Sequence, residues 1–180
     1  MILKAFLVTI VLFVVALGGS PLSEPKSPQP LAQQTTDEWN TYYKPYSYSI
    51  DYPTINGTAN ITEAERSIVL ISIPDFYIMI TSFHSTLLDP QEQAVKSQME
   101  DVSSGIETVS EVQPIYADLQ FGYGYFTMDP IKFKSTSEMF FETSDTYYQI
   151  STYGITYDKP SMDLYGDRIS KLQSSLKFFD

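Results

Sequence analysis

The stretch YSYSIDYP, residues 46–53, opens the part of the chain in which hydrophobic residues follow a regular pattern. Aromatic and aliphatic side chains stand at every second position, which is the period of a β-strand with one buried face. These residues are Tyr46, Tyr48, Ile50 and Tyr52. Because proline cannot donate a hydrogen bond to a neighbouring strand, we expect this strand to end at Pro53 and a polar turn to follow over 54–64.

Further runs of β-branched and aromatic residues predict more strands on the C-terminal side of this stretch. They cover residues 67–73, 76–83, 107–115, 119–128, 133–142 and 147–156. The first two are separated only by Pro74 and Asp75, which suggests a hairpin. In the run 119–128, Gly122 and Gly124 lie opposite the face that carries Tyr123, so we expect another backbone or a helix to approach closely there.

Two segments have the pattern of helices. The first covers residues 90–104: Asp89 can cap it, Pro90 suits its first position, Glu92 completes a capping box, and Gly105 ends it. Its apolar stripe is predicted to face the core. That stripe consists of Val95, Met99 and Val102.

The second helix is predicted over residues 161–175, with Ser161 as its cap. Its core-facing stripe consists of Tyr165, Ile169, Leu172 and Leu176. The order of strands, helix, strands and helix predicts an α+β protein with helices packed on an antiparallel sheet.

The N-terminus has the features of an export signal. Residues 5–17 form an apolar run behind Lys4, and small residues follow, so we expect 1–18 to be a signal peptide or a short membrane anchor. Residues 19–40 are rich in Pro, Ser and Gln and are predicted to be a disordered linker, with one domain over 41–180. The protein is therefore expected outside the cytoplasm, either secreted or tethered to the outer face of the membrane.

Two N-x-[ST] sequons lie close together, at Asn56 and Asn60, and both are candidates for glycosylation in an exported chain. The alternative is that both are chance matches in a polar turn.

The composition limits the classes of partner and of chemistry. The formal net charge is −11, which repels phosphate backbones and disfavours nucleic acid as a partner. The chain has no cysteine, which excludes disulfides and thiolate chemistry. With 14 Tyr and 11 Phe, the chain has aromatic residues for a sheet core and for a binding surface.

Several stretches resemble the PsbP-like family, named for an extrinsic oxygen-evolving subunit of photosystem II. They are YSYSIDYP at 46–53, Leu88-Asp89-Pro90 before the first helix, TYYQISTYG at 146–154, and the closing SSLKF at 174–178. The resemblance implies an α/β/α sandwich around a central antiparallel sheet. It also implies a non-catalytic, membrane-peripheral protein for which calcium is a possible cofactor. Because the chain has one histidine and an unmatched polar stretch after Tyr52, we predict a non-photosynthetic member.

Few residues suggest catalysis or metal binding. His84 is the one histidine, and a hydrolase-like role would require a carboxylate beside it in a concave site. Asp163 and Asp167 are four residues apart on the second helix and are weak candidates for a cation, although a solvated helix surface explains them as well.

We therefore predict a protein that is not an enzyme and that binds or supports a membrane or cell-surface complex. The alternatives are a calcium-associated extrinsic subunit of a membrane complex and a module that binds a small molecule or lipid on an aromatic sheet face. A cavity lined by Tyr123 and Tyr148 would support the second alternative, whereas a role in the core and in cross-strand pairs explains the tyrosines as well. The tyrosines on adjacent predicted strands are Tyr123, Tyr125, Tyr147, Tyr148, Tyr153 and Tyr157.

Overall fold

The computed structural model describes residues 37–64, 67–84, 89–106 and 108–179. The predicted signal peptide or anchor, and most of the predicted linker, lie outside these residues. The first strand begins at Glu38, just before the linker boundary expected from composition. Among the described residues, no helix is both long enough and apolar enough to cross a membrane.

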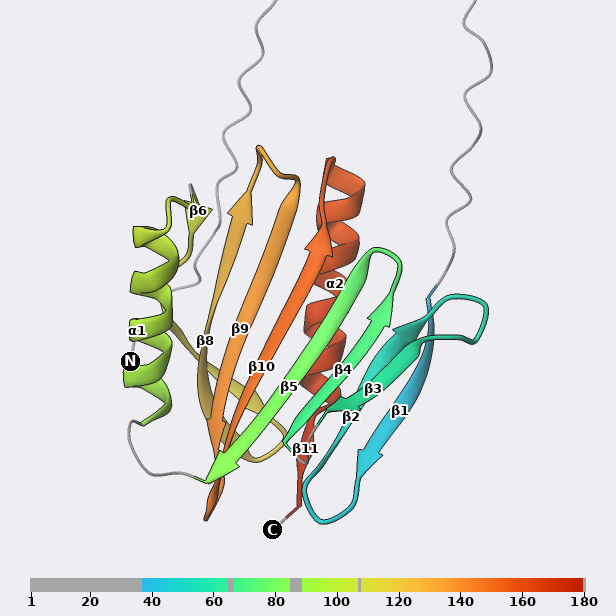
Figure 1. The fold of residues 1–180 in the computed structure, drawn as a ribbon, viewed down its shortest axis with the longest axis vertical. Helices are drawn as coiled ribbons and strands as arrows, with labels where there is room; N and C mark the ends of the chain where they lie inside the picture. Colours follow the sequence, from blue (N-terminus) through green and yellow to red (C-terminus); the bar gives the residue numbers. More distant parts are fainter. Residues whose placement is uncertain (1–36, 65–66, 85–88, 107, 180) are drawn as a thin grey trace, which may run out of the picture. The chain divides into compact units, whose positions relative to one another are not determined.

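The described residues form mostly β-strand, arranged in two antiparallel sheets (Figure 1). The larger sheet has the strand order β3-β4-β5-β10-β9-β8-β6, and β7 also pairs with β8. The smaller sheet has the order β1-β2-β11. The strands are β1 (Glu38–Lys44), β2 (Tyr48–Thr54), β3 (Asn60–Ala64), β4 (Ile68–Ile73), β5 (Phe76–His84), β6 (Thr108–Val109), β7 (Gln113–Ala117), β8 (Gln120–Asp129), β9 (Lys134–Glu142), β10 (Thr146–Ile155) and β11 (Lys177–Phe178). The helices are α1 (Pro90–Ser103) and α2 (Lys159–Ser175).

Strand β2 forms from the stretch YSYSIDYP but does not end at Pro53, as the sequence predicted. It runs to Thr54, and Pro53 is paired with Trp39 of β1. The reason is the direction of the backbone N–H groups. The Asp51 backbone N–H points away from β1 and donates to the Ser175 hydroxyl at 2.9 Å. Residue 53 lies two positions further along the strand, so its backbone nitrogen points to the same side. The missing proline N–H therefore falls on the side where β11, which pairs only with Tyr48 and Ser49, has already ended.

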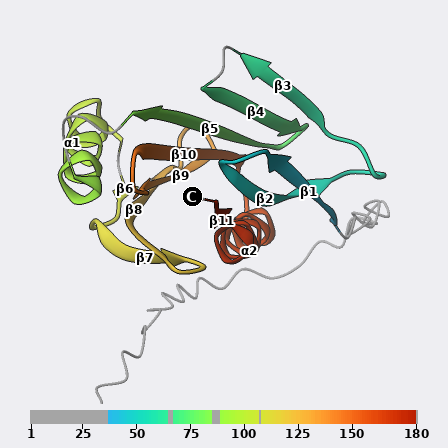
Figure 2. The same cartoon turned by 90° about the horizontal axis from the view of Figure 1, so that it is seen from below.

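One face of the larger sheet forms the main core, together with α2 and β2 (Figure 2). We call this the α2 face. The alternating side chains of β4, β5, β9 and β10 are buried there against β2 and the apolar stripe of α2, which confirms the predicted stripe. Two contacts connect the layers: the Tyr48 and Tyr148 rings meet edge to face at 5.8 Å, and the Ser47 hydroxyl lies 3.0 Å from the Tyr148 hydroxyl.

Helix α1 packs on the opposite face of the larger sheet, which we call the α1 face, and covers only its β8 and β9 side (Figures 1 and 2). A second, smaller core forms there between Ala94 of α1 and the rings of Tyr125, Phe140 and Tyr147. The β4 and β5 side of this face stays partly open, with Leu70, Tyr77 and Met79 each exposed.

The α/β/α sandwich expected for this chain is therefore wrong. The prediction placed residues 46–53 in one central sheet with the other strands. Instead, β2 pairs with β1 and β11 and forms a second sheet, which shares the α2 face with α2. The result is a β-rich fold with two antiparallel sheets, in which α1 covers part of the other face.

The helix boundaries follow their caps. Asp89 accepts a hydrogen bond from the Glu92 backbone N–H at 2.9 Å, and Pro90 is the first residue of α1, as predicted. Gly105 follows the helix with a left-handed φ of 85°. Helix α2 begins earlier than predicted, because Asp158 rather than Ser161 is its cap and the two residues form a reciprocal capping box.

The apolar stripe of α1 faces outward, contrary to the prediction. Val95, Met99 and Val102 are 38%, 66% and 57% exposed, while Ala94 is fully buried. The small Ala94 side chain allows the helix backbone to approach Phe140 closely, which a larger residue would prevent.

Glycines bring the strands of the larger sheet close together, as expected for Gly122 and Gly124. A Cβ atom on Gly122 would lie 2.3 Å from the Phe140 carbonyl oxygen and 2.5 Å from the Phe141 ring. On β10, a Cβ atom on Gly154 would lie 2.2 Å from the Tyr165 ring of α2. Gly154 thus allows α2 to lie directly on the sheet.

Candidate functional site

A polar pocket of about 460 Å³ lies between the C-terminal end of α1 and the α1 face of the larger sheet. Its wall includes Asp101 and the loop 104–106, which Gly105 turns back toward the sheet. Its floor comes from β8 and β9 and carries Thr127, Thr136 and Glu138. Asp129, Lys132 and Lys134 complete the lining.

Strand register positions the floor of this pocket. Thr127 of β8 is paired with Thr136 of β9, and Tyr125 with Glu138, so all four side chains lie on the α1 face. The two threonine hydroxyl oxygens are 2.5 Å apart. These hydroxyls can each offer a ligand a further hydrogen bond, because a hydroxyl is both a donor and an acceptor.

Two carboxylates in the pocket are held by neutral donors. Glu138 accepts hydrogen bonds from the Ser151 hydroxyl at 2.6 Å and the Gln149 side-chain amide at 3.1 Å. Asp101 accepts one from the Tyr125 hydroxyl at 2.8 Å. Burial raises the pKa of Glu138 above its ordinary value, and the nearby charge of Asp101 raises it further, while the two donors oppose that shift.

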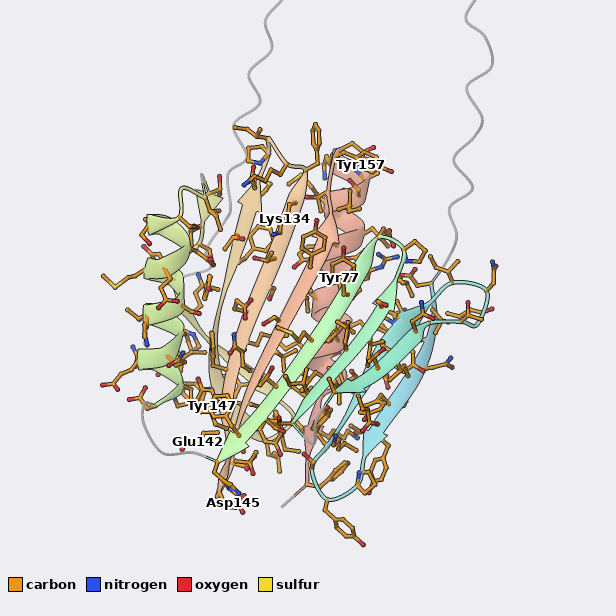
Figure 3. The ribbon with its side chains drawn as sticks, in the orientation of Figure 1. Tyr77, Lys134, Glu142, Asp145, Tyr147 and Tyr157 are labelled. Atoms are coloured by element: carbon orange, nitrogen blue, oxygen red, sulfur yellow. The ribbon has the colours of Figure 1, made fainter. Side chains whose placement is uncertain are left out.

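The two lysines of the pocket have different surroundings. Lys132 forms an ion pair with Asp129 at 3.2 Å. Lys134 instead places its ammonium 4.8 Å from the centre of the Tyr153 ring, a cation–π contact. Tyr153 in turn stacks on Tyr77 of β5, with ring centres 4.7 Å apart and planes 21° from parallel. Lys134 therefore connects the pocket to an aromatic pair on the open side of the α1 face (Figure 3 labels Lys134 and Tyr77).

The tyrosines predicted to form a ligand surface do not all meet. Strand parity puts Tyr123, Tyr125, Tyr147 and Tyr153 on the α1 face and Tyr148 on the α2 face. A single cavity lined by Tyr123 and Tyr148 is therefore ruled out. Tyr157 lies beyond the end of β10 and is 66% exposed.

The remaining predicted site residues lie apart from the pocket. His84 ends β5 and is exposed, and its Nδ1 lies 3.3 Å from the Asp145 carbonyl oxygen. Asp163 and Asp167 are exposed on α2, and Lys159 donates to both oxygens of Asp163 at 2.8 and 2.7 Å. In the part of the chain that the structure describes, no group of three or more His, Cys, Asp or Glu is arranged to hold a metal ion. The role for calcium implied by the resemblance stays a prediction.

Sequence reasoning missed most of the pocket. The sequence pattern points neither to Asp101 nor to the lining residues on β8 and β9. One signal was present: Glu138 is a charged residue in the middle of a predicted strand, on the same face as Phe140.

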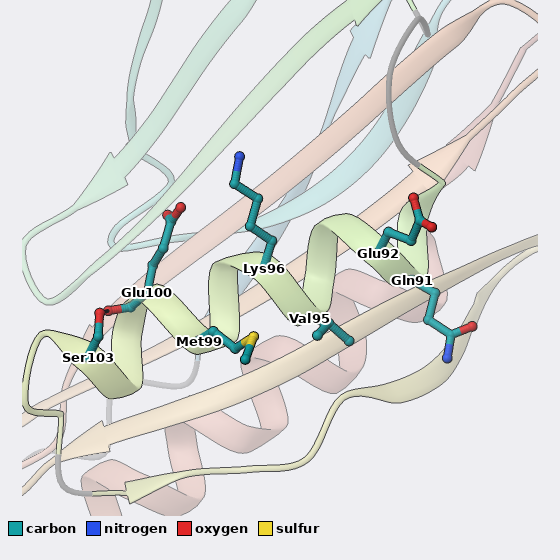
Figure 4. A pocket seen from close by; sticks show the side chains of 7 residues that line it. All are labelled: Gln91, Glu92, Val95, Lys96, Met99, Glu100 and Ser103. Atoms are coloured by element: carbon teal, nitrogen blue, oxygen red, sulfur yellow. Dashed lines mark hydrogen bonds between the residues drawn. The ribbon is translucent and has the colours of Figure 1, made fainter.

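A shallow surface hollow of about 610 Å³ lies along the outward side of α1, and all the described residues that line it belong to that helix (Figure 4). Val95 and Met99 form its apolar part, and Glu92, Lys96 and Glu100 its charged part. Two of the three residues of the stripe that was predicted to be buried, Val95 and Met99, therefore line this hollow.

Comparisons with known proteins leave the family open. No protein-family model matches the sequence, and no curated protein matches it. Among solved structures, a crystal structure from Bacteroides thetaiotaomicron VPI-5482 is similar at 11% sequence identity with a TM-score of 0.45. The match covers 74% of this chain and 45% of that chain, so this chain spans less than half the length of the protein it matches. The resemblance to the PsbP-like family stays a prediction.

Proposed function

We propose that this protein is a non-catalytic binding module that holds a small neutral saccharide in the polar pocket between α1 and the larger sheet. The observation that carries the proposal is the position of Lys134. Lys134 lines a pocket whose described residues include three carboxylates and two threonine hydroxyls, and its ammonium lies over the Tyr153 ring, which stacks on Tyr77.

The charges in the pocket support a neutral ligand. The described residues that line the pocket include three carboxylates and two ammonium groups, and one of each is already paired, as Asp129 with Lys132. A strongly anionic ligand would meet the carboxylates of Asp101 and Glu138, and a strongly cationic one would meet Lys134. Sugar hydroxyls can both donate to carboxylates and accept from an ammonium group, and they need no net charge.

The proposal is tested with isotope-labelled full-length protein and a panel of monosaccharides at millimolar concentration. Amide shifts in two-dimensional NMR are expected to concentrate at β8 and β9 around Thr127 and Thr136. Lys134→Ala is expected to weaken binding about tenfold, because it removes a charged hydrogen-bond donor. Lys96→Ala, on the exposed side of α1, is the matched control and should bind as the wild type does. Absence of shifts at the pocket with every sugar would overturn the proposal.

Location outside the cytosol is part of this proposal, and its support is the apolar run at residues 5–17 followed by a polar, Pro-rich stretch. Cell fractionation tests it directly. Recovery of the full-length product in the cytosol would contradict it.

A second candidate function is support of a membrane or cell-surface complex, and the outward stripe of α1 favours it. Val95, Met99 and Val102 present exposed apolar side chains along α1, and none of them belongs to a core cluster of the described residues. Pull-down from intact membranes, with residues 19–36 retained, is expected to recover a partner with the wild type but not with Met99→Lys. Val95 and Met99 can be tested separately from the pocket, because Lys134→Ala should leave this interaction unchanged.

A further inference from the structure

A hollow of about 570 Å³ lies at the β3 and β4 edge of the larger sheet, away from the polar pocket. Both sequon asparagines line it, with Leu70, Ser72 and Tyr77 on the sheet side. Register places Asn60, Ser72 and Tyr77 side by side on three adjacent strands, with Asn60 paired to Ser72 and Ser72 to Tyr77. The small Ser72 side chain leaves the hollow between the asparagine and the tyrosine.

The fold explains Asn56 without any modification. Asn56 and Gly57 both have positive φ, 53° and 73°, and they form the two-residue turn between Ile55 and Thr58. Asn-Gly is the preferred pair for such a turn, because asparagine and glycine adopt left-handed φ most readily. The Thr58 hydroxyl donates a hydrogen bond to the Ile55 carbonyl oxygen at 2.8 Å. The threonine of this sequon therefore stabilises the turn.

The Asn60 side chain, in contrast, has no such role in a turn. Asn60 begins β3, a strand in which every residue is exposed, and its side chain makes no hydrogen bond to another described residue. Asparagine is disfavoured in strands. Strand β3 is also the edge of the larger sheet and carries the exposed Ile61, and exposed edges promote association with other chains unless something covers them.

Tyr77 offers an aromatic surface on the other side of the hollow. One face of its ring stacks on Tyr153, while the neighbour on its other side is the small Ser72. Tyr77 is 38% exposed, and Leu70 beside it is 39% exposed. The face of an aromatic ring is negatively polarised and attracts the C–H groups on the apolar side of a sugar ring.

We infer that Asn60 is an N-glycosylation site and that the first sugar of its glycan packs over Ser72 against the open face of Tyr77. The distance to be covered is two strand spacings, roughly 9–10 Å, which an asparagine side chain and one sugar ring can span. The glycan would cover the exposed edge strand and the apolar residues near it. The inference shares with the proposed function only the requirement that the chain leave the cytosol, and it does not depend on the pocket.

The site is tested by mass spectrometry of the protein purified from its native source. A peptide that contains Asn60 is expected to be heavier than its sequence mass by sugar residues, with fragmentation placing them on Asn60. Thr62→Ala, which destroys the sequon but keeps Asn60, should abolish the modification. Asn56→Gln is the matched control and should leave it in place. An unmodified Asn60 in exported native protein would overturn the inference.

The contact with Tyr77 is tested by a thermal-unfolding cycle on the same glycosylated background. Removal of the glycan by Thr62→Ala is expected to lower the unfolding temperature by about 2–4 °C. In a Tyr77→Ala background, the same change should have little effect, because the sugar has lost its aromatic partner. An equal loss in both backgrounds would refute the packing of the sugar on Tyr77. Loss of sugar binding at the pocket would leave these results unchanged, so the two proposals can fail separately.

Discussion

Arg168 joins α2 to Asp37 and Asp75, and its replacement by alanine is expected to destabilise the protein by about 3–5 kcal/mol. Its guanidinium donates two hydrogen bonds to Asp37, from Nε at 2.8 Å and from Nη2 at 2.9 Å, and one to Asp75 from Nη1 at 3.2 Å. The guanidinium also lies 5.3 Å from the centre of the Phe76 ring. Burial lowers the pKa of Arg168, but the hydrogen bonds and charges of Asp37 and Asp75 outweigh that effect and leave the pKa raised.

The size of the effect follows from burial. The Arg168 and Asp37 side chains are 5% and 7% exposed, so removal of the guanidinium leaves a buried carboxylate without its partner. Breaking a buried pair in this way costs about 3–5 kcal/mol. The Asp75 side chain is 42% exposed and its pairing contributes at most about 1 kcal/mol.

The assay is equilibrium unfolding in urea at pH 7 with the full-length chain. Lys159→Ala is the matched control, because the pair of Lys159 with Asp163 has a similar separation of 2.7 Å but its side chains are 79% and 62% exposed. Its loss should cost less than about 1 kcal/mol.

A second variant separates the charge from the packing. If the cost of Arg168→Ala comes from the buried carboxylate, then adding Asp37→Asn should recover a large part of the lost stability. The reasoning is refuted if Arg168→Ala costs no more than Lys159→Ala. It is also refuted if Asp37→Asn fails to restore stability in the Arg168→Ala background.

Two further predictions concern packing and pH. Gly154→Ala places a methyl group 2.2 Å from the buried Tyr165 ring and should lower the free energy of unfolding by about 1–3 kcal/mol, whereas Gly166→Ala meets no atom within 4 Å and should raise it by up to about 1 kcal/mol. Urea unfolding measures both, and equal effects of the two substitutions would contradict the close packing of α2 on the sheet. Because the pKa of Glu138 is raised in the folded state, the folded protein holds this proton more tightly than the unfolded chain. Stability should therefore fall as the pH rises from about the ordinary value of 4.5 through the folded pKa, and Glu138→Gln should remove that fall. A pH profile that Glu138→Gln leaves unchanged would show that this carboxyl group is not the cause.

The local elements were largely predictable from the sequence. The Pro74-Asp75 hairpin, the Asp89 cap, the core stripe of α2 and most of the strand runs after residue 67 are confirmed. The run predicted as one strand over 107–115 instead forms two short strands, β6 and β7, which pair with different parts of β8. Each depends on residues close together in the chain, because periodicity and capping act over a few positions. The sequence missed β1 and β3, whose polar and largely exposed residues give little periodic signal.

The candidate site was much less predictable. The polar pocket needs Asp101 on α1 to stand beside Thr127 and Glu138 on two strands, and this depends on where α1 packs. Val95, Met99 and Val102 predicted the wrong side of that helix, because its one buried residue among those described is the small Ala94. Close packing through a small side chain has no distinctive pattern in the sequence.

The sequence by itself therefore determined both helices, the Asp89 cap, most of the strands after residue 67 and the aromatic composition of the core. Only the tertiary structure decided that β2 belongs to a second sheet with β1 and β11, that Tyr123 and Tyr148 lie on opposite faces, and that Lys134 connects a polar pocket to an aromatic pair. The physical reason is that strand pairing and helix placement depend on contacts between residues far apart in the chain. Alternation along one strand says which residues share a face, but not which layer that face packs against.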